Sequence, residues 1–183
     1  QIQAVYTAKT MDEYQSAVNA LDRIAGAEKT KWEPYYYSAF GNVMMATRET
    51  VPSKKDAYLD QALAAVEKGK AIVPGESELV ALEGFVHMIR VTVDPASRGQ
   101  QYSGLAMQTF GRALGMNPNN PRAMSLMAQM QFGTAQFFNQ QPIEACETAR
   151  KALAIFDLGT KSENPLAPQW GKEMTAGLIQ NCK

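Results

Sequence analysis

Apolar side chains recur at helical spacing along most of the chain, separated by short polar stretches that contain glycine or proline. The stretch MDEYQSAVNALDRIAG has apolar residues every three or four positions, which predicts an amphipathic helix at residues 9–25. Residues 1–8 carry no clear period. Pro34 stands where a second helix starts, and Pro52 separates that helix from the next. The pattern therefore predicts an all-α chain.

One spacing of small and apolar residues occurs three times. Its clearest copy is Ala106, Phe110 and Ala113, which share one helix face, followed by Pro118, which ends the helix. Small residues at such positions let neighbouring helices approach closely. The other two copies are Ala62, Val66, Gly69 and Pro74, and Ala145, Ala149, Ala152 and Asp157.

This motif resembles the second-helix signature of tetratricopeptide repeats, Ala-x3-Phe followed by a helix-ending proline. The resemblance implies a right-handed α-α superhelix, a short TPR-like solenoid of about three helix pairs with flanking N-terminal and C-terminal helices. Within a single domain spanning 1–183, it assigns repeats to 32–74, 76–118 and 121–157 and a capping helix to 167–181. The third copy is alanine-only, and the Trp and Leu expected early in the first helices are mostly replaced. An irregular helical bundle is the alternative.

The distance between Pro74 and Pro118 is 44 residues, longer than the roughly 34 residues of a standard repeat. We therefore expect an inserted crossover with a loop at 94–99, and an ion pair between Arg90 and Asp94. Insertions in repeat proteins form binding surfaces, so residues 94–102 are a candidate partner site. A capped surface connection is the plainer interpretation. The candidate side chains are Arg98, Gln101 and Tyr102.

The resemblance also implies a concave groove, lined by the first helix of each pair, that binds a peptide or partner protein. Amide side chains there would satisfy the backbone of an extended peptide, while methionine and aromatic side chains would adapt to its side chains. The alternative for the apolar positions is ordinary core packing. The groove candidates are Tyr35, Ser38, Asn42, Met45, Glu78, Phe85, Met88, Arg122, Ser125, Gln129 and Phe132.

Cochaperones of this family grip a terminal carboxylate with a clamp of Lys, Asn, Asn, Lys and Arg, and this chain mostly lacks it. Only the second and fourth places keep a suitable side chain, so a chaperone tail is not the expected partner. The matching residues are Ser38, Asn42, Leu82, Arg122 and Leu126.

Charge and composition narrow the function classes further. Lysine plus arginine and aspartate plus glutamate are 18 each, so the chain has no net field to attract nucleic acid. No apolar run is long enough to cross a bilayer. The chain opens on Gln1 rather than methionine, which is typical of a processed periplasmic or secreted protein and equally of a trimmed sequence.

The chain has one histidine and two cysteines, which limits the metal or catalytic sites that these residues could form. His87 is the one histidine and has apolar neighbours, which favours a neutral, hydrogen-bonded, partly buried imidazole. One histidine and two distant cysteines give no metal ligand set, and no cofactor motif is present. Cys146 and Cys182 either form a disulfide that ties the capping helix to the array or remain two free thiols.

These observations favour a noncatalytic protein-interaction scaffold that binds a peptide or partner protein in the groove or at residues 94–102. The alternative is a structural subunit that self-associates through an end of the array, as in an envelope assembly. A small hydrolase is least favoured, because no paired acids or activated nucleophile stand out.

Overall fold

The computed structural model describes residues 1–159 and 164–182, which form helices joined by short connections and contain no strand. This confirms the all-α fold class. The helices in the described residues are α1 (Ile2–Thr7), α2 (Met11–Ala27), α3 (Glu33–Arg48), α4 (Pro52–Ile72), α5 (Ser77–Val91), α6 (Pro95–Met116), α7 (Pro121–Phe137), α8 (Ile143–Leu158) and α9 (Lys172–Gln180).

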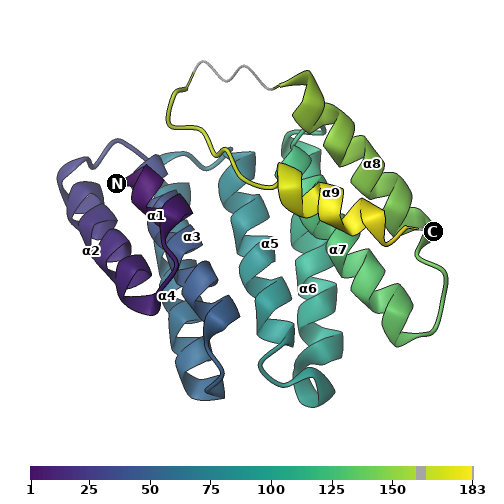
Figure 1. Cartoon of the computed structure of the whole chain (residues 1–183). Coiled ribbons are helices and arrows are strands. Elements are labelled where there is room, and N and C mark those ends of the chain that lie inside the picture. The colour runs from purple at the N-terminus through teal and green to yellow at the C-terminus, as the bar shows by residue number, and fades with distance from the viewer. Residues whose placement is uncertain (160–163, 183) are drawn as a thin grey trace.

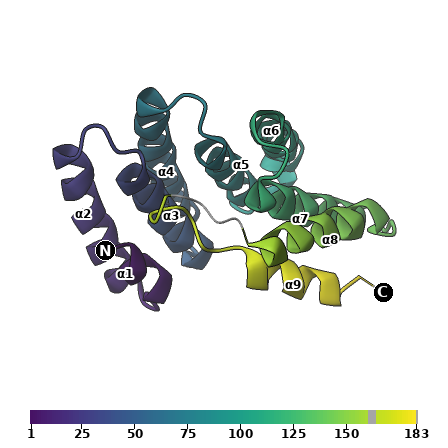
Figure 2. The ribbon, with the colours of Figure 1, turned by 90° about the horizontal axis from the view of Figure 1, so that it is seen from above.

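The helices pack mainly as consecutive pairs, α3 with α4, α5 with α6, and α7 with α8 (Figure 1). The first helices of the pairs also contact one another, α3 with α5 and α5 with α7. They therefore form one continuous layer, which we call the inner layer. In Figure 2, α9 and the segment before it lie along this layer, on the side away from α6.

Local sequence explains where these helices begin. The Thr10 hydroxyl accepts from the backbone N–H of Glu13, whose carboxylate accepts from the N–H of Thr10, which makes a capping box at α2. Asn120 caps α7 through the N–H of Ala123, and Pro121 follows at the first helical position. Each cap satisfies an N–H that the first helical turn leaves without a partner.

The repeated small-residue motif forms the contact between paired helices. Ala106, Phe110 and Ala113 are completely buried in α6. A methyl group on Gly84 of α5 would lie 2.5 Å from the Phe110 ring. A larger residue at Gly84 would therefore push α5 and α6 apart.

The predicted loop at 94–99 is wrong, because α6 already begins at Pro95. Asp94 accepts a hydrogen bond from the N–H of Ser97 and Pro95 occupies the first turn, so the pair starts a helix instead of breaking one. The segment expected to form a loop is the first turn of α6, which has 22 residues. Arg98, Gln101 and Tyr102 consequently lie on a helix.

The predicted ion pair between Arg90 and Asp94 is also wrong. Arg90 donates to Asp56 at 3.1 Å and to Asp60 at 2.7 Å, both on α4. Arg98 donates to the same Asp56 at 2.8 Å. The arginines of the supposed insertion therefore join α4, α5 and α6 to one another.

The two ends of the chain differ most from the predicted boundaries. The helix expected at 9–25 is α2, and the preceding α1 is too short to have shown a period. The capping helix expected at 167–181 is confined to α9, and residues 164–171 before it are not helical. Part of the linker predicted before that helix lies outside the described residues. Among the described helices, none is long and apolar enough to span a membrane.

Candidate functional site: a pocket beneath the C-terminal strap

Residues 164–171, which we call the strap, run across the inner layer to reach α9 (Figure 2). The Tyr37 hydroxyl on α3 donates to the carbonyl of Leu166 at 2.9 Å. The backbone N–H of Gln169 donates to the Tyr6 hydroxyl on α1 at 3.1 Å. The strap is thus bonded to helices from the opposite end of the sequence.

Trp170 is the largest side chain of the strap and lies over both α3 and α5. Its ring stacks on Phe40, with ring centroids 4.9 Å apart, and on Phe85, at 5.8 Å. Its indole Nε1 donates to the Tyr36 hydroxyl at 2.9 Å. The Tyr36 side chain is completely buried, and this burial raises the pKa of its hydroxyl well above the ordinary value. Tyr36 is therefore a neutral, fixed acceptor for the indole.

A buried ion pair supports the strap from below. Arg122 of α7 donates from Nε and Nη2 to the two carboxylate oxygens of Glu78 on α5, at 2.7 and 2.8 Å. Arg122 Nη1 lies 3.3 Å from the carbonyl oxygen of Trp170, to which it donates. Burial opposes the charge on Arg122, but the Glu78 carboxylate outweighs burial and raises the pKa of the guanidinium. The pair thus connects α5, α7 and the strap.

Gly171 turns the chain from the strap into α9. Its φ is 110°, a left-handed conformation that favours glycine. A methyl group there would also lie 2.8 Å from the Phe156 ring and 3.3 Å from Arg122 Cγ. A residue with a side chain would displace the turn that presents Trp170.

Beyond this turn, α9 is fixed to the array by polar and covalent contacts. The Thr175 hydroxyl lies 2.6 Å from the Ser125 hydroxyl of α7, and both side chains are fully buried. Cys146 of α8 and Cys182 are joined by a disulfide, with Cα atoms 5.8 Å apart. The disulfide interpretation of the two cysteines is therefore confirmed.

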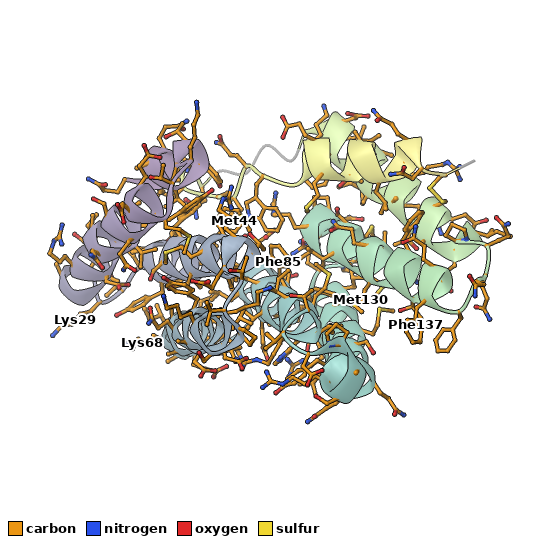
Figure 3. The ribbon with its side chains drawn as sticks, turned by 60° about the horizontal axis from the view of Figure 1, so that its bottom comes forward. Lys29, Met44, Lys68, Phe85, Met130 and Phe137 are labelled. Carbon is orange, nitrogen blue, oxygen red and sulfur yellow. A yellow bond between two sulfur atoms is a disulfide. The ribbon has the colours of Figure 1, made fainter. Side chains whose placement is uncertain are left out.

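A pocket of about 410 Å³ opens beside Trp170, between the N-terminal helices and the strap. Aromatic rings and a methionine supply much of its wall. Figure 3 shows Met44 and Phe85 on the neighbouring inner helices α3 and α5. The lining residues are Gln3, Val5, Tyr6, Tyr14, Phe40, Met44, Gln169, Trp170 and Glu173.

Several predicted groove side chains are committed to contacts within the chain. Met45 is completely buried, and Ser38 donates to Asp22 at 2.5 Å. Asn42 is buried and donates to the carbonyl of Ser38 at 3.0 Å. Their assignment to an open groove is corrected, because α2 and α4 cover these faces of α3.

Other predicted groove residues are occupied by contacts with the strap, with α9 or with one another. Phe85 lies under Trp170, and Ser125 lies against Thr175. Glu78 and Arg122, expected to face a partner, bind each other instead. Tyr35 donates to the carbonyl of Ala25 at 3.1 Å. The predicted groove residues that stay partly exposed on α5 and α7 are Glu78, Met88, Gln129 and Phe132.

Sequence reasoning missed the residues that the pocket brings together. Tyr6 lies in the N-terminal stretch without a period, and Trp170 lies in the non-helical strap. Phe40 and Met44 carried the only available signal, because they stand four residues apart on α3 and therefore share a face.

His87 lies away from this pocket, on the side of α5 that faces α6. Its ring stacks on Tyr102, with centroids 6.2 Å apart, and its Nε2 lies 3.9 Å from Glu83 Oε1. Its Nδ1 is buried and has no hydrogen-bond partner among the described residues, and 3.9 Å is too long for a hydrogen bond at Nε2. The imidazole is buried as expected, but the expected hydrogen bond is not found among the described residues. The described residues contain no cluster of metal-ligating side chains.

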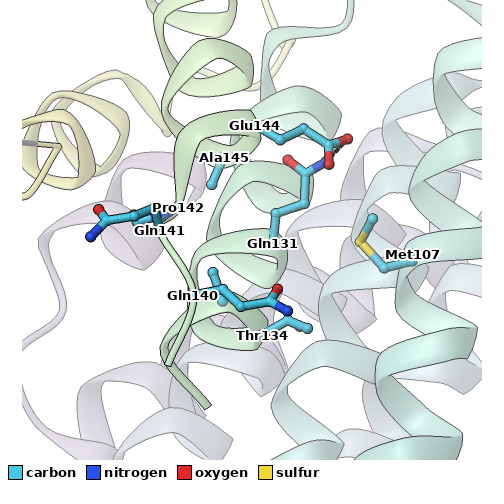
Figure 4. Close-up of a pocket in the computed structure, with 9 residues that line it drawn as sticks. Met107, Gln131, Thr134, Gln140, Gln141, Pro142, Glu144 and Ala145 are labelled. Atoms are coloured by element: carbon cyan, nitrogen blue, oxygen red, sulfur yellow. Dashed lines mark hydrogen bonds between the residues drawn. The ribbon is translucent and has the colours of Figure 1, made fainter. Parts of the chain in front are cut away.

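A second pocket of about 240 Å³ lies between α6, α7 and α8 (Figure 4). Gln131 donates to Glu144 at 2.8 Å at its edge. Phe137 and Phe138, at the end of α7, are 81% and 62% exposed. The amides and single carboxylate that line this pocket do not form a nucleophile–base pair.

Comparisons with known proteins identify one informative similarity. No protein-family model matches the chain, and no curated protein matches it. Among solved structures, the chain is similar to the HusA haemophore from Porphyromonas gingivalis, with a TM-score of 0.86 and 28% sequence identity. The match covers 100% of this chain and 90% of that one. The chain therefore shares its all-helical fold, over its whole length, with a ligand-binding protein rather than an enzyme.

Proposed function

We propose that this protein is a noncatalytic carrier that binds haem in the pocket beneath the strap. The similarity to a haemophore over the whole chain is the observation that carries the proposal. The pocket gives it a physical basis, because its walls suit a flat, mostly apolar molecule.

The stacked rings of Trp170 and Phe40 provide a planar aromatic surface, and Tyr6 packs edge-on against Phe40 at 6.0 Å. Met44 adds a polarizable, adaptable thioether at the same wall. The pocket volume of about 410 Å³ is within the range of small-molecule sites, roughly 300–1,000 Å³. A macrocycle stacked on Trp170 would exchange water for ring contacts on one face.

Iron coordination by histidine or cysteine does not fit this pocket. His87 lies on the far side of α5, and Cys146 and Cys182 are bonded to each other. Of the side chains that hold haem iron in proteins, the pocket offers the thioether of Met44 and the hydroxyls of Tyr6 and Tyr14. We infer that stacking and apolar contact supply most of the affinity.

We also infer that the array is TPR-like, on the repeated small-residue contact such as Gly84 against Phe110. In such an array the inner layer is the peptide-binding side. Here the strap already lies over part of that layer, with Tyr37 bonded to its backbone. A groove for an extended chain is thereby reduced to a pocket for a small ligand.

A titration of the full chain with haem tests the proposal, with the haem absorbance band and the quenching of tryptophan fluorescence as readouts. We expect saturable one-site binding. The Met44→Ser variant should bind roughly tenfold more weakly, because it loses apolar contact at the wall. The matched Met116→Ser variant, on the exposed end of α6, should bind like the wild type. Absence of saturable binding by the wild type would refute the proposal.

A peptide ligand is the second candidate, favoured by one unsatisfied donor. Gln129 Nε2 on α7 is buried and has no hydrogen-bond partner among the described residues. It would donate to a backbone carbonyl of an extended peptide laid beside the strap. Fluorescence anisotropy of a labelled random pentapeptide pool, compared between wild type and Gln129→Leu, would show this binding or its absence.

We further propose that the protein works in an oxidising compartment. The disulfide between Cys146 and Cys182 supports this, because such bonds persist mainly in exported proteins. Thiol titration of the unfolded, unreduced protein from its native source should find no free thiol, and two reactive thiols would contradict the proposal.

A further inference from the structure

Arg48 lies at the last turn of α3 and contacts two residues that line the pocket. Its guanidinium carbon is 4.7 Å from the centroid of the Tyr14 ring, over which it lies. Its Nη1 donates to the carbonyl of Met44 at 3.0 Å. Tyr14 and Met44 both line the pocket, so two contacts to the pocket wall fix the direction of this arginine.

The charge on Arg48 is not used by the fold. Among the described residues, no carboxylate pairs with it, whereas Arg90, Arg98, Arg112 and Arg122 each pair with an acid. The contact to the Met44 carbonyl occupies one nitrogen, Nη1. The N–H groups of Nε and Nη2 remain for an anion at the pocket edge.

The pocket lining itself contains one acidic side chain. Glu173, at the start of α9, lines the pocket. Arg48 does not line it, but contacts two lining residues, Tyr14 on α2 and Met44 on α3. A carboxylate on a bound ligand would be repelled by Glu173 and attracted by Arg48. A ligand with an apolar body and an acidic edge would therefore bind with that edge toward Arg48 and away from Glu173.

We propose that Arg48 is a specificity-determining residue that binds the carboxylates of a planar aromatic acid held against Trp170. The inference rests on the proposed function and deepens it: the pocket selects macrocycles with free carboxylates over their esters. Arginine and carboxylate form two parallel, charge-assisted hydrogen bonds, and the stacking on Tyr14 fixes the guanidinium before the ligand arrives. Less side-chain freedom is then lost on binding.

The experiment compares two ligands on two proteins. Iron protoporphyrin IX and its dimethyl ester have the same macrocycle and iron, but the ester lacks both charges. The wild type should bind the free acid about two- to fivefold more tightly than the ester, as expected for a charge pair at an exposed edge. Arg48→Gln should bind both ligands with the affinity that the wild type has for the ester. Higher salt should weaken binding of the free acid by the wild type, with a much smaller effect in Arg48→Gln.

Two further variants control for changes unrelated to recognition. Arg150→Gln removes an exposed arginine of α8 and should retain the full preference for the free acid. Arg48→Lys keeps the charge but not the planar fork, and should retain part of the preference. Thermal unfolding of each variant checks that the fold is intact.

The outcomes separate the two proposals. If the wild type binds acid and ester equally well, or if Arg48→Gln weakens both ligands by the same factor, the role of Arg48 is overturned while haem binding stands. If the wild type binds neither ligand, the proposed function itself fails. A preference that is lost only in Arg48→Gln supports both.

Discussion

The two sides of α5 show contrasting uses of polar residues. On the side facing α4 and α6, charges are numerous and satisfied within the chain: Arg90 bonds Asp56 and Asp60, and Glu83 contacts Lys70 at 3.1 Å and Arg112 at 3.0 Å. We call this the charged layer. It joins three consecutive helices.

The other side of α5 is apolar. There Phe85 meets Trp170, and Trp170 in turn meets Phe40. The exception is the pair of Arg122 and Glu78, which is buried and used to hold the strap. The charged layer therefore uses several ion pairs to join helices, whereas the side of α5 beneath Trp170 has aromatic contacts and one ion pair. The proposed flat apolar ligand would consequently displace water from few charges.

The largest effect on stability is expected at the ion pair between Arg122 and Glu78, where the inner layer uses opposite charges to join helices as the charged layer does. Arg122→Ala would leave the Glu78 carboxylate buried without its partner. We expect the free energy of unfolding, measured by urea denaturation, to fall by about 3–5 kcal/mol.

The control replaces both charges. Because an apolar pair of similar size removes the desolvation penalty along with the attraction, Arg122→Met with Glu78→Leu should cost far less than Arg122→Ala alone. Equal losses in the two variants would show that packing, and not an unpaired charge, dominates at this position.

The disulfide is the next contact in expected size, and it holds the inner layer through α9. Cys146→Ser with Cys182→Ser opens a loop with a sequence separation of 36 and should lower the free energy of unfolding by about 3–4 kcal/mol. Reductant should destabilise the wild type by the same amount and leave the variant unchanged. A variant that responds to reductant like the wild type would contradict this expectation.

The charged layer should make the free energy of unfolding depend on pH in the acid range. Burial opposes the charge of Glu83, but His87, Lys70 and Arg112 outweigh burial and lower its pKa from 4.5 to about 2. The unfolded chain therefore takes up this proton first as the pH falls. The stabilisation is complete above pH 4.5 and is lost between pH 4.5 and 2, at a cost of about 2–3 kcal/mol.

Urea denaturation at a series of pH values checks this contribution. Glu83→Gln should show a smaller loss of stability between pH 5 and about pH 2 than the wild type, because it has no proton to gain. Glu147→Gln, on the exposed face of α8, should keep the wild-type pH dependence. Identical profiles for wild type and Glu83→Gln would place the acid sensitivity elsewhere.

The smallest expected effect is on ligand affinity at the neutral wall. Trp170→Leu keeps an apolar side chain but removes the stacking surface, so the affinity for haem should fall about tenfold. Phe137→Leu, an aromatic-to-leucine change at an exposed position outside the pocket, should leave the affinity unaltered. A haem titration of the two variants would contradict the assignment of the wall if both lost affinity equally.

The sequence predicted the all-α fold and the buried helix faces well, because their signals are local. The spacing of Ala106, Phe110 and Ala113 identifies a buried helix face, and Pro118 marks its end. The error at 94–99 has a local cause too, because Asp94 followed by proline is a helix start as well as a turn signal. The close approach expected from the small residues is seen where Phe110 packs against Gly84.

The candidate pocket was not predicted, because its contacts are non-local. Trp170 and the Tyr36 hydroxyl are 134 residues apart in sequence. The sequence of the strap has no periodicity that would indicate which helices it contacts. The periodicity of α3 shows which of its residues share a face, but not that Phe40 packs against Trp170 near the other end of the chain. Only the disulfide hypothesis, which tied the last helix to α8, pointed toward this closure.

The route of the strap determines when, during folding, the pocket can form. Tyr6 and Tyr37, near the N-terminal end, form hydrogen bonds with the backbone of Gln169 and Leu166, near the C-terminal end. The pocket beside Trp170 is therefore complete only after these distant parts of the chain have come together. Such long-range closure is costly in chain entropy and is expected late in folding. A nascent or damaged copy would have many of the helices but not this pocket, so the proposed ligand would bind only to completely folded molecules.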